Sequence, residues 1–475
     1  MKTKYSVLTL FLVLITTGLD AKVRMPALFS DHMVLQQNSE VPVWGWADKG
    51  KKITVVTSWD KKTYTAQVNS DGSWKVRILS PSAGGPYEMT ISDGEEFKIK
   101  DIMIGEVWLC AGQSNMEMPM KGFRGQPVEG SNVDIVTSSN YWIRFISVPR
   151  NLKTVPQKDF NGNWEIAAPG SVSEFSATAY YFGSLLQKVL KVPVGLVEVS
   201  YGGSCVEAWI SRENTASFNG KEVPGIADSV RIDNRTPSTL FYGMLSPVIG
   251  FPVKGVIWYQ GETNYINAEY YTDRFSTMVR EWRTLWGQGN FPFYYVQIAP
   301  FDYSVFHNKE EYLEKYNSAY LREAQLKALD VIPESGMAVT IDVGEKNNIH
   351  PGKKRVVGER LCFLALGKTY NVKGIGYDTP MVKGVETDGS SLVISFDNIP
   401  NGITSYGKVV DCFEIAGEDE KFYPANVDVR SKSVVLSSPD IENPVAARYA
   451  FRDFVTGQLF GVEGIPVPSF RTDNW

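Results

Sequence analysis

Between residues 101 and 370, apolar runs of strand length alternate with longer amphipathic stretches of helical length. This alternation predicts an α/β fold, in which a mostly parallel sheet is covered by helices on both faces. Sheets of this kind bind ligands beyond the carboxyl ends of their strands. We expect strands at 102–109, 194–199, 253–259, 293–298 and 338–343, and helices at 177–190, 270–285, 311–329 and 353–367.

The segments on either side of this region are rich in short strands. From about Val23 to Lys100, alternating strands are separated by turn signals such as Asp71-Gly72, which is typical of an antiparallel sandwich. A similar pattern returns after about Tyr370. A chain of 475 residues can form two or three cores. We therefore divide it into an N-terminal β-rich region (22–100), an α/β hydrolase region (101–370) with a loop-rich insertion at about 121–175, and a C-terminal β-rich region (371–475).

The first 21 residues have the pattern of a secretory signal peptide. Lys2 and Lys4 precede an apolar stretch from Val7 to Ile15, and small and polar residues lead to Ala21. The stretch is too short to cross about 30 Å of hydrocarbon. We expect residues 1–21 to be removed and the mature protein to be exported, periplasmic or secreted, with no integral membrane segment.

Charge and cysteine content exclude several classes of partner. The net charge is −5 and no dense block of lysine and arginine occurs, so nucleic acid is not expected to bind. The four cysteines are few for a disulfide scaffold and none has metal-ligand spacing. The chemistry described next needs no metal or organic cofactor.

The predicted strand at 102–109 leads into Gly112-Gln-Ser-Asn115, which places Ser114 on a glycine-permitted turn at the end of a strand. A serine hydroxyl becomes a nucleophile only when a base removes its proton. Of the three histidines, His32 lies in the first β-rich region and His307 in a polar stretch that predicts a solvated surface. His350 precedes Pro351 and a predicted helix, and a helix N-terminus disfavours the imidazolium. The sequence therefore predicts Ser114 as nucleophile and His350 as base.

Two further strand ends carry residues suited to an oxyanion hole. Tyr201-Gly-Gly-Ser204 follows one predicted strand, and Gln260-Gly-Glu-Thr-Asn264 follows another. A tetrahedral oxyanion needs preorganised donors. We expect these to be the N–H groups of Ser114 and Gly203, with a side-chain amide from Gln260 or Asn264. The alternative is that the glycines only shape tight turns and Gln260 caps a strand.

Together these residues resemble the SGNH hydrolase superfamily and, more closely, the sialate O-acetylesterase family of carbohydrate esterases. The similarity extends over nearly the whole chain, and it implies an SGNH-like parallel sheet flanked by helices. The motifs that carry it are Met33-Val-Leu-Gln-Gln37, Val41–Ala47, Gly105–Met116, Tyr201–Ser204, Glu207-Ala-Trp209, Trp258–Glu262, Trp282-Arg283, Ile349-His-Pro351, Arg448–Phe451 and Glu463–Arg471.

The resemblance assigns Ser114 as nucleophile, His350 as general base and acid, and Gly203 as oxyanion donor. Many relatives have an aspartate two residues before the histidine, where this chain has Asn348. The imidazole would then be oriented by Asn348, by a backbone carbonyl, or by a carboxylate such as Asp342 or Glu345. We also expect Asn348→Asp to raise activity or leave it unchanged. The residues expected to bind substrate are Gln113, Asn115, Glu262, Trp209 and Tyr242, the last replacing a frequent asparagine.

The expected function is that of an exported serine carbohydrate esterase that removes O-acetyl groups from glycans, with acetylated sialic acids as the leading substrate. Acetylxylan or another acetylated polysaccharide is the alternative substrate. A non-catalytic glycan-binding protein with a decayed esterase core is an alternative of another class. A glycosidase is a third reading, because carboxylates lie near the motifs and could form a catalytic pair; they are Glu106, Glu117, Glu207 and Glu262.

Overall fold

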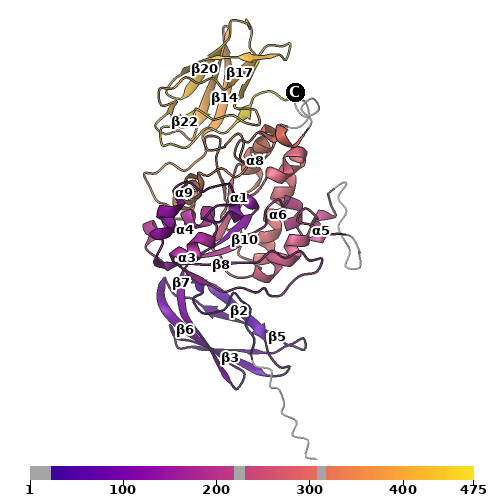
Figure 1. Ribbon diagram of the computed structural model, residues 1–475, viewed down its shortest axis with the longest axis vertical. Coiled ribbons are helices and arrows are strands. Elements are labelled where there is room, and N and C mark those ends of the chain that lie inside the picture. The colour runs from indigo at the N-terminus through magenta and orange to yellow at the C-terminus, as the bar shows by residue number, and fades with distance from the viewer. Residues whose placement is uncertain (1–22, 219–230, 308–316) are drawn as a thin grey trace, which may run out of the picture.

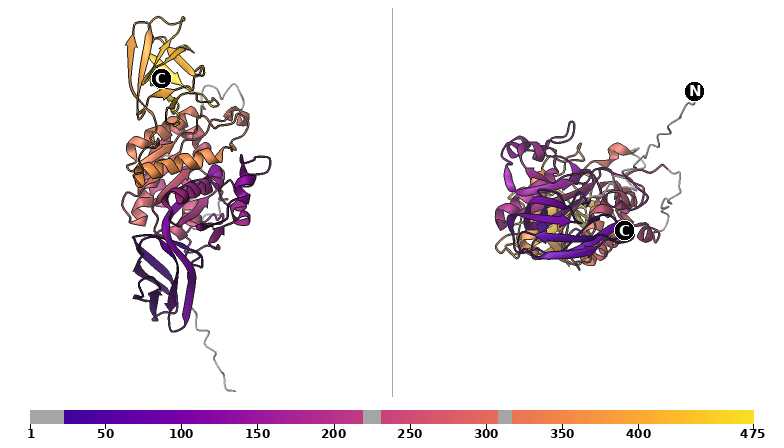
Figure 2. Two further views of the ribbon diagram at one scale, coloured as in Figure 1. Left: turned by 90° about the vertical axis from the view of Figure 1, so that its left-hand side faces the viewer. Right: turned by 90° about the horizontal axis from the view of Figure 1, so that it is seen from below.

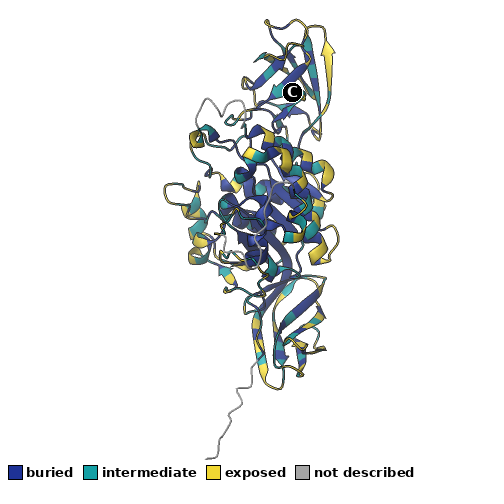
Figure 3. Cartoon of the chain, turned by 90° about the vertical axis from the view of Figure 1, so that its right-hand side faces the viewer, coloured by how far each residue is buried: buried dark blue, intermediate teal, exposed yellow. Residues whose placement is uncertain are grey.

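The computed structural model describes residues 23–218, 231–307 and 317–475. The expected signal peptide, residues 1–21, lies outside this range. The molecule is elongated, with a β-rich region at each end and an α/β region between them (Figures 1 and 2). Buried residues are concentrated in the strands of the middle part, and the helices around them expose their outer faces (Figure 3). Among the described residues, no helix is both long and apolar enough for a membrane span.

The N-terminal region is built from short antiparallel strands. Strand β3 alternates between buried and more exposed side chains, as expected for a strand with one face on a core. It pairs with β4 and β6, and β2 pairs with β5. The strands are β1 (Val34–Gln36), β2 (Glu40–Trp46), β3 (Lys52–Thr57), β4 (Thr63–Gln67), β5 (Ser73–Leu79) and β6 (Gly84–Ser92).

One long strand, β7 (Glu96–Gly112, 17 residues), runs from the N-terminal region into the middle of the molecule. Its first half pairs with β6, and its second half pairs with strands of the central sheet. The burial pattern changes along it: the first six residues are mostly exposed or half-buried, and every residue from Ile102 onward is buried. The limit that we place at residue 100 therefore falls inside a continuous strand.

The central sheet has the order β13-β12-β11-β7-β10-β8-β9. All of these pairs are parallel except that of β8 with β9. The predicted mostly parallel sheet is therefore confirmed. Gly112 at the end of β7 is aligned with Ser200 of β10 and Tyr259 of β11, so three strand ends meet at one edge. The strands are β8 (Asn140–Ser147), β9 (Glu165–Ala167), β10 (Val194–Ser200), β11 (Gly255–Tyr259), β12 (Phe293–Val296) and β13 (Ser335–Ala338).

Helices cover both faces of this sheet. Alternate residues of β11 enter different cores: Trp258 packs in the core that contains residues of α6 and α8, and Ile257 in the core that contains residues of α4 and α9. Figure 1 shows these two helix pairs on opposite sides of the sheet. The longer helices are α4 (Ala177–Leu190), α6 (Tyr271–Trp286), α8 (Ala319–Val331) and α9 (Lys354–Leu364); the shorter ones are α1 (Ser114–Glu117), α2 (Ser131–Val136), α3 (Pro169–Glu174) and α5 (Arg212–Thr215).

Three predicted elements differ from the structure. A strand was expected at 338–343, but β13 covers Ser335–Ala338, so the two share only Ala338. The chain turns beyond it, where Val343 N–H bonds to Thr340 O, although the apolar residues of 339–343 stay buried. Helix α8 begins at Ala319, and residues 311–316 of the expected helix lie outside the described range. The segment at 121–175 contributes β8 to the central sheet. Only four consecutive residues of β8 are buried, too few to stand out in the sequence.

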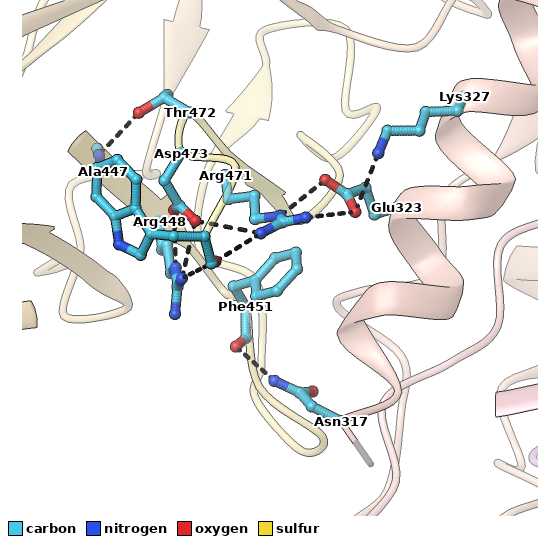
Figure 4. A network of polar contacts seen from close by, with 10 residues as sticks. Asn317, Glu323, Lys327, Ala447, Arg448, Phe451, Arg471, Thr472 and Asp473 are labelled. Carbon is cyan, nitrogen blue, oxygen red and sulfur yellow. Dashed lines mark hydrogen bonds and ion pairs between the residues drawn. The ribbon is translucent and has the colours of Figure 1, made fainter. Parts of the chain in front are cut away.

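The C-terminal region is β-rich, as predicted, and packs against the N-terminal end of α8. Arg471 pairs with Glu323 of α8 at 2.9 Å, and Asn317 Nδ2 donates to Phe451 O at 3.1 Å (Figure 4). The strands are β14 (Met381–Asp388), β15 (Ser391–Asp397), β16 (Ile403–Thr404), β17 (Phe413–Ala416), β18 (Phe422–Pro424), β19 (Asn426–Val429), β20 (Ser433–Ser437), β21 (Ala446–Tyr449), β22 (Phe460–Gly461) and β23 (Phe470–Arg471).

Candidate active site

Ser114 lies at the carboxyl end of β7, on the turn into the short helix α1. The turn requires a glycine at position 112, whose φ is +146° and where a Cβ would come within 2.1 Å of Tyr259 O. The backbone is also fixed on the far side of this glycine, where Gln113 N–H bonds to Tyr259 O at 2.9 Å. The strand end thus holds Ser114 in one position at the edge where three strands meet.

Ser114 and His350 are in direct contact, although 236 positions separate them. The distance from Ser114 Oγ to His350 Nε2 is 2.7 Å. At the other side of the ring, Nδ1 lies 2.8 Å from Gln126 Oε1. A carbonyl oxygen can only accept, so Nδ1 carries the proton and Nε2 is free to accept from the serine hydroxyl. The ring of Phe123 packs edge-on against the imidazole, with centroids 5.3 Å apart.

None of the three side chains expected to orient the imidazole contacts its ring. Asn348 Oδ1 accepts from the His350 backbone N–H at 3.1 Å, and its Nδ2 donates to Glu345 Oε2 at 3.1 Å. Asp342 is held by both terminal nitrogens of Arg360, at 2.6 and 2.7 Å. Glu345 also accepts from Gly352 N–H at 2.7 Å. These residues fix the histidine loop, so a carboxylate at position 348 would face Glu345, and the expected gain from Asn348→Asp has no structural basis.

Gln126 occupies the position beside Nδ1, and sequence reasoning missed it. It lies 224 positions before His350, in the segment expected to be a loop-rich insertion. Nothing in the residues around it marks a side chain that contacts a histidine. Only the tertiary fold brings Gln126 to the ring.

His350 is mostly buried, and burial lowers the pKa of its imidazole to about 4, with a further contribution from the nearby Lys354 cation. The expected cause was a helix N-terminus. Helix α9, however, begins at Lys354, so His350 lies before the helix and outside its first turn. Burial and a neighbouring charge therefore keep this base neutral.

This pKa predicts the pH dependence of the reaction. A base must be neutral to accept a proton, so kcat/KM should hold as pH falls through 6.5 and decline only near pH 4. In Lys354→Met the charge is removed but the burial remains, so the acidic limb should move upward only part of the way toward 6.5. The measurement is kcat/KM for acetate release between pH 3 and 8, on enzyme shown to remain folded. An acidic limb near 6.5 in the unmodified enzyme would contradict this account.

A buried polar network lies beneath Ser114. Lys354 Nζ donates to Asn115 Oδ1, and Asn115 Nδ2 donates to Glu262 Oε1 at 2.5 Å and to Ile349 O at 3.0 Å. Asn115 thus joins the nucleophile turn to the residue that precedes His350. Burial lowers the pKa of Lys354 to about 7 and raises that of Glu262, while their opposite charges oppose both shifts. Asn115 was expected to bind substrate, but its amide is used inside the protein.

Two backbone N–H groups are available as oxyanion donors. Gly203, at φ +73°, and Ser114 have no intramolecular acceptor for their N–H groups among the described residues. Gly202 N–H differs, because it donates to Glu117 Oε2 at 2.8 Å. The N–H groups of Ser114 and Gly203 therefore remain the candidates.

The side-chain amides expected to complete the oxyanion hole are used elsewhere. Gln260 Nε2 donates to Ser204 O at 3.1 Å and to Asn264 Oδ1 at 2.7 Å. Asn264 Nδ2 donates to Glu207 Oε2 at 3.0 Å. Both amides are buried behind the Gly203 loop, which they support, and the expectation that either one faces the oxyanion was wrong.

A cavity of about 650 Å³ opens over Ser114 and His350. Of the residues expected to bind substrate, Gln113 and Glu262 line it. Trp209 is fully buried and donates to Ser204 Oγ at 3.0 Å, and the Tyr242 hydroxyl accepts from Arg212 N–H at 3.2 Å. Trp209 and Tyr242 therefore belong to the core. Glu117, expected only as a candidate glycosidase carboxylate, also lines the cavity. The lining residues that sequence reasoning missed include Phe123, Arg150, Arg235, Tyr265, Tyr303 and Phe306.

His307 was expected on a solvated surface, but it lines this cavity and its Nε2 contacts the Tyr265 hydroxyl. Among the described residues, the hydrogen bond of Ser114 Oγ goes to His350 and not to His307. His32 instead bonds through Nδ1 to Asp101 Oδ2 at 2.6 Å in the N-terminal region, a local contact of the kind expected.

The carboxylates near the motifs do not form a free pair. Glu106 accepts from Tyr370 OH at 2.7 Å and Glu207 binds Arg274; neither lines the cavity. Glu117 is bound by Arg150, and Glu262 belongs to the buried network. A glycosidase mechanism needs one free carboxyl on each side of the bond to be cut, so this arrangement does not favour it.

A serine at the carboxyl end of a parallel sheet, hydrogen-bonded to a neutral imidazole, is an arrangement typical of serine hydrolases. Two backbone N–H groups with no acceptor among the described residues lie beside it. A family model described as carbohydrate esterase, sialic acid-specific acetylesterase, matches residues 104–361. The chain belongs to this family, and it is a carboxylic-ester hydrolase.

Similar proteins match over nearly all of the chain. The sialate O-acetylesterase of Mus musculus is 25% identical, with 90% of this chain and 89% of that protein covered. The sialate O-acetylesterase of Homo sapiens is 27% identical, with 90% and 87% covered. The crystal structure of a carbohydrate acetylesterase from Xanthomonas citri has a TM-score of 0.86 and is 34% identical, with 95% of this chain and all of that chain covered.

Proposed function

We propose that the protein removes O-acetyl groups from acetylated sialic acids, with Ser114 as nucleophile and His350 as general base and acid. The observation that carries the proposal is the 2.7 Å contact between Ser114 Oγ and His350 Nε2 at the floor of the cavity. The sialate O-acetylesterases of mouse and human that resemble this chain support the choice of sugar.

In the first half of the reaction, Ser114 Oγ attacks the acetyl carbonyl carbon while His350 Nε2 takes the serine proton. The carbonyl oxygen becomes an oxyanion, and the N–H groups of Ser114 and Gly203 donate hydrogen bonds to it in this proposal. The C–O bond to the sugar then breaks, and Nε2–H gives its proton to the leaving sugar oxygen. The product is a free sugar hydroxyl and an acetyl group on Ser114.

In the second half, His350 takes a proton from water, and the hydroxide oxygen attacks the acetyl-serine. The second tetrahedral intermediate collapses to acetic acid, which ionises to acetate in water, and the proton on Nε2 returns to Ser114 Oγ. Each step forms an imidazolium for a short time. Gln126 can hold its Nδ1–H, but a neutral carbonyl stabilises that positive charge less than a carboxylate does.

We also propose that the protein is exported and that residues 1–21 are its signal peptide. Support comes from the two lysines, the short apolar stretch and the small residues before Ala21. Export would bring the enzyme to acetylated glycans outside the cytoplasm.

The substrate is tested by acetate release from a panel of acetylated sialosides, acetylxylan and acetylated pectin, with Ser114→Ala as the blank. Acetylated sialosides should react about tenfold faster than the others, or more, because polar groups that match one sugar are left unpaired by another. Faster release from acetylxylan would move the substrate to a polysaccharide. No release from any acetyl ester would favour a non-catalytic glycan-binding protein.

A further inference from the structure

We propose that Arg235 forms a carboxylate-binding subsite in the cavity, so that the enzyme selects acetylated sugars that carry a carboxylate. The inference rests on the proposed function and deepens it, because it states which property of a sialic acid the protein recognises.

The charges that line the cavity are balanced except at one residue. Glu117 and Arg150 form a two-pronged pair, at 2.5 and 2.7 Å. Glu262 belongs to the buried network whose cation is Lys354. Arg235 is exposed and lines the cavity. Among the described residues, no carboxylate lies within ion-pair distance of its guanidinium, so one positive charge remains for a ligand.

The backbone of Arg235 is attached to the loop that carries the proposed oxyanion donor. Asn234 Nδ2 donates to Gly202 O at 2.6 Å, and Cys205 Sγ lies 3.0 Å from Arg235 O. The nearby Asp233 carboxylate is used locally, because it accepts the N–H groups of Arg235 and Thr236 at 2.8 and 3.0 Å. These contacts fix the base of the Arg235 side chain beside Gly203, near the reacting ester.

The chemistry of a guanidinium fits a carboxylate. Its N–H groups form a planar fork that bonds to both oxygens, and such charge-assisted hydrogen bonds are stronger than neutral ones. Sialic acids carry a carboxylate on the anomeric carbon, whereas the xylose units that bear acetyl groups in acetylxylan are neutral. The protein has a net charge of −5, so its overall field repels an anionic sugar, and a local cation would offset that repulsion.

The test compares acetate release from an O-acetylated sialic acid and from the same sugar with its carboxylate converted to a carboxamide. The amide keeps the shape but removes the charge. The unmodified enzyme should favour the acid by about tenfold in kcat/KM, as expected for a charge-assisted pair at a partly exposed site. In Arg235→Gln this ratio should fall to about one, mainly through KM of the acid, and added salt should reduce the ratio of the unmodified enzyme.

Arg231→Gln is the matched control, because it removes the same charge from an exposed residue of the same segment that does not line the cavity. It should keep the ratio of the unmodified enzyme. An unchanged ratio in Arg235→Gln would overturn the subsite. An equal fall of the ratio in Arg235→Gln and Arg231→Gln would also overturn it, because the preference for the acid would then come from the overall electrostatic field of the protein. If the unmodified enzyme hydrolyses acid and amide equally well, the subsite fails and the esterase function stands. If it releases acetate from neither, the proposed function itself fails.

Discussion

Ser114→Ala and His350→Ala should each lower kcat/KM for acetate release by about 10⁴-fold or more. In the proposed mechanism the first variant removes the attacking oxygen, and the second removes the one group among the described residues that hydrogen-bonds to that oxygen, at 2.7 Å. Because the two side chains act in the same steps, the double variant should be no less active than either single one. The measurement is acetate release at saturating enzyme, with thermal unfolding followed in parallel to show that the fold is intact.

His32→Ala is the control for a lost imidazole, because its ring bonds to Asp101 in the N-terminal region, far in the sequence from the site. It should keep the activity of the unmodified enzyme. Turnover near the unmodified level in His350→Ala would show that another group takes the serine proton. His307 would then be the next residue to replace, since it also lines the cavity.

Gln126→Ala should lower kcat by about 100-fold, the second largest effect we expect. Without the acceptor 2.8 Å from Nδ1, the imidazole can rotate or place its proton on Nε2, and in both cases it no longer accepts from Ser114. The loss should fall mainly on kcat, because Gln126 does not line the cavity over Ser114 in which we propose that the sugar binds.

Gln126→Glu tests whether Gln126 orients the His350 imidazole or only packs against it. A carboxylate beside Nδ1 stabilises the imidazolium, so the pKa of His350 should rise and the acidic limb should move above pH 4. In the same variant kcat should equal or exceed that of the unmodified enzyme at neutral pH. If Gln126→Ala retains full activity, or if the acidic limb does not move in Gln126→Glu, Gln126 does not orient the base.

The features that the sequence could predict are those set by short-range patterns. Helix α4 was expected at 177–190, and that is where it lies, because its apolar residues recur at helical spacing between a serine cap and Lys191. The turn at Ser114 was also predictable, since a glycine at the end of a buried strand permits the positive φ that a sharp turn needs. His350 could be chosen because a chain with three histidines offers few bases.

The parts that were not predictable depend on contacts between distant segments. Gln126 and His350 meet only in the folded chain, and no local pattern distinguishes Gln126 from other polar loop residues. Gln260 and Asn264 follow a strand end, as oxyanion donors would, yet their amides bond to neighbouring loops. Trp209 follows a motif at the sheet edge, but burial places it in the core. Sequence indicates which loops surround the site, and packing decides which side chains face it.

Strand β7 joins the N-terminal region rigidly to the central sheet. Its 17 residues span about 55 Å as one extended segment, paired along its length with strands of both the N-terminal region and the central sheet. A hinge between these two parts would have to break strand pairing. The N-terminal region and the strand end that carries Ser114 should therefore move as one rigid body. A chain cut at residue 100 would lose β6 and leave the start of the nucleophile strand as an unpaired edge. The N-terminal region is thus a support for the strand that presents the serine, and it cannot be removed as a separate module.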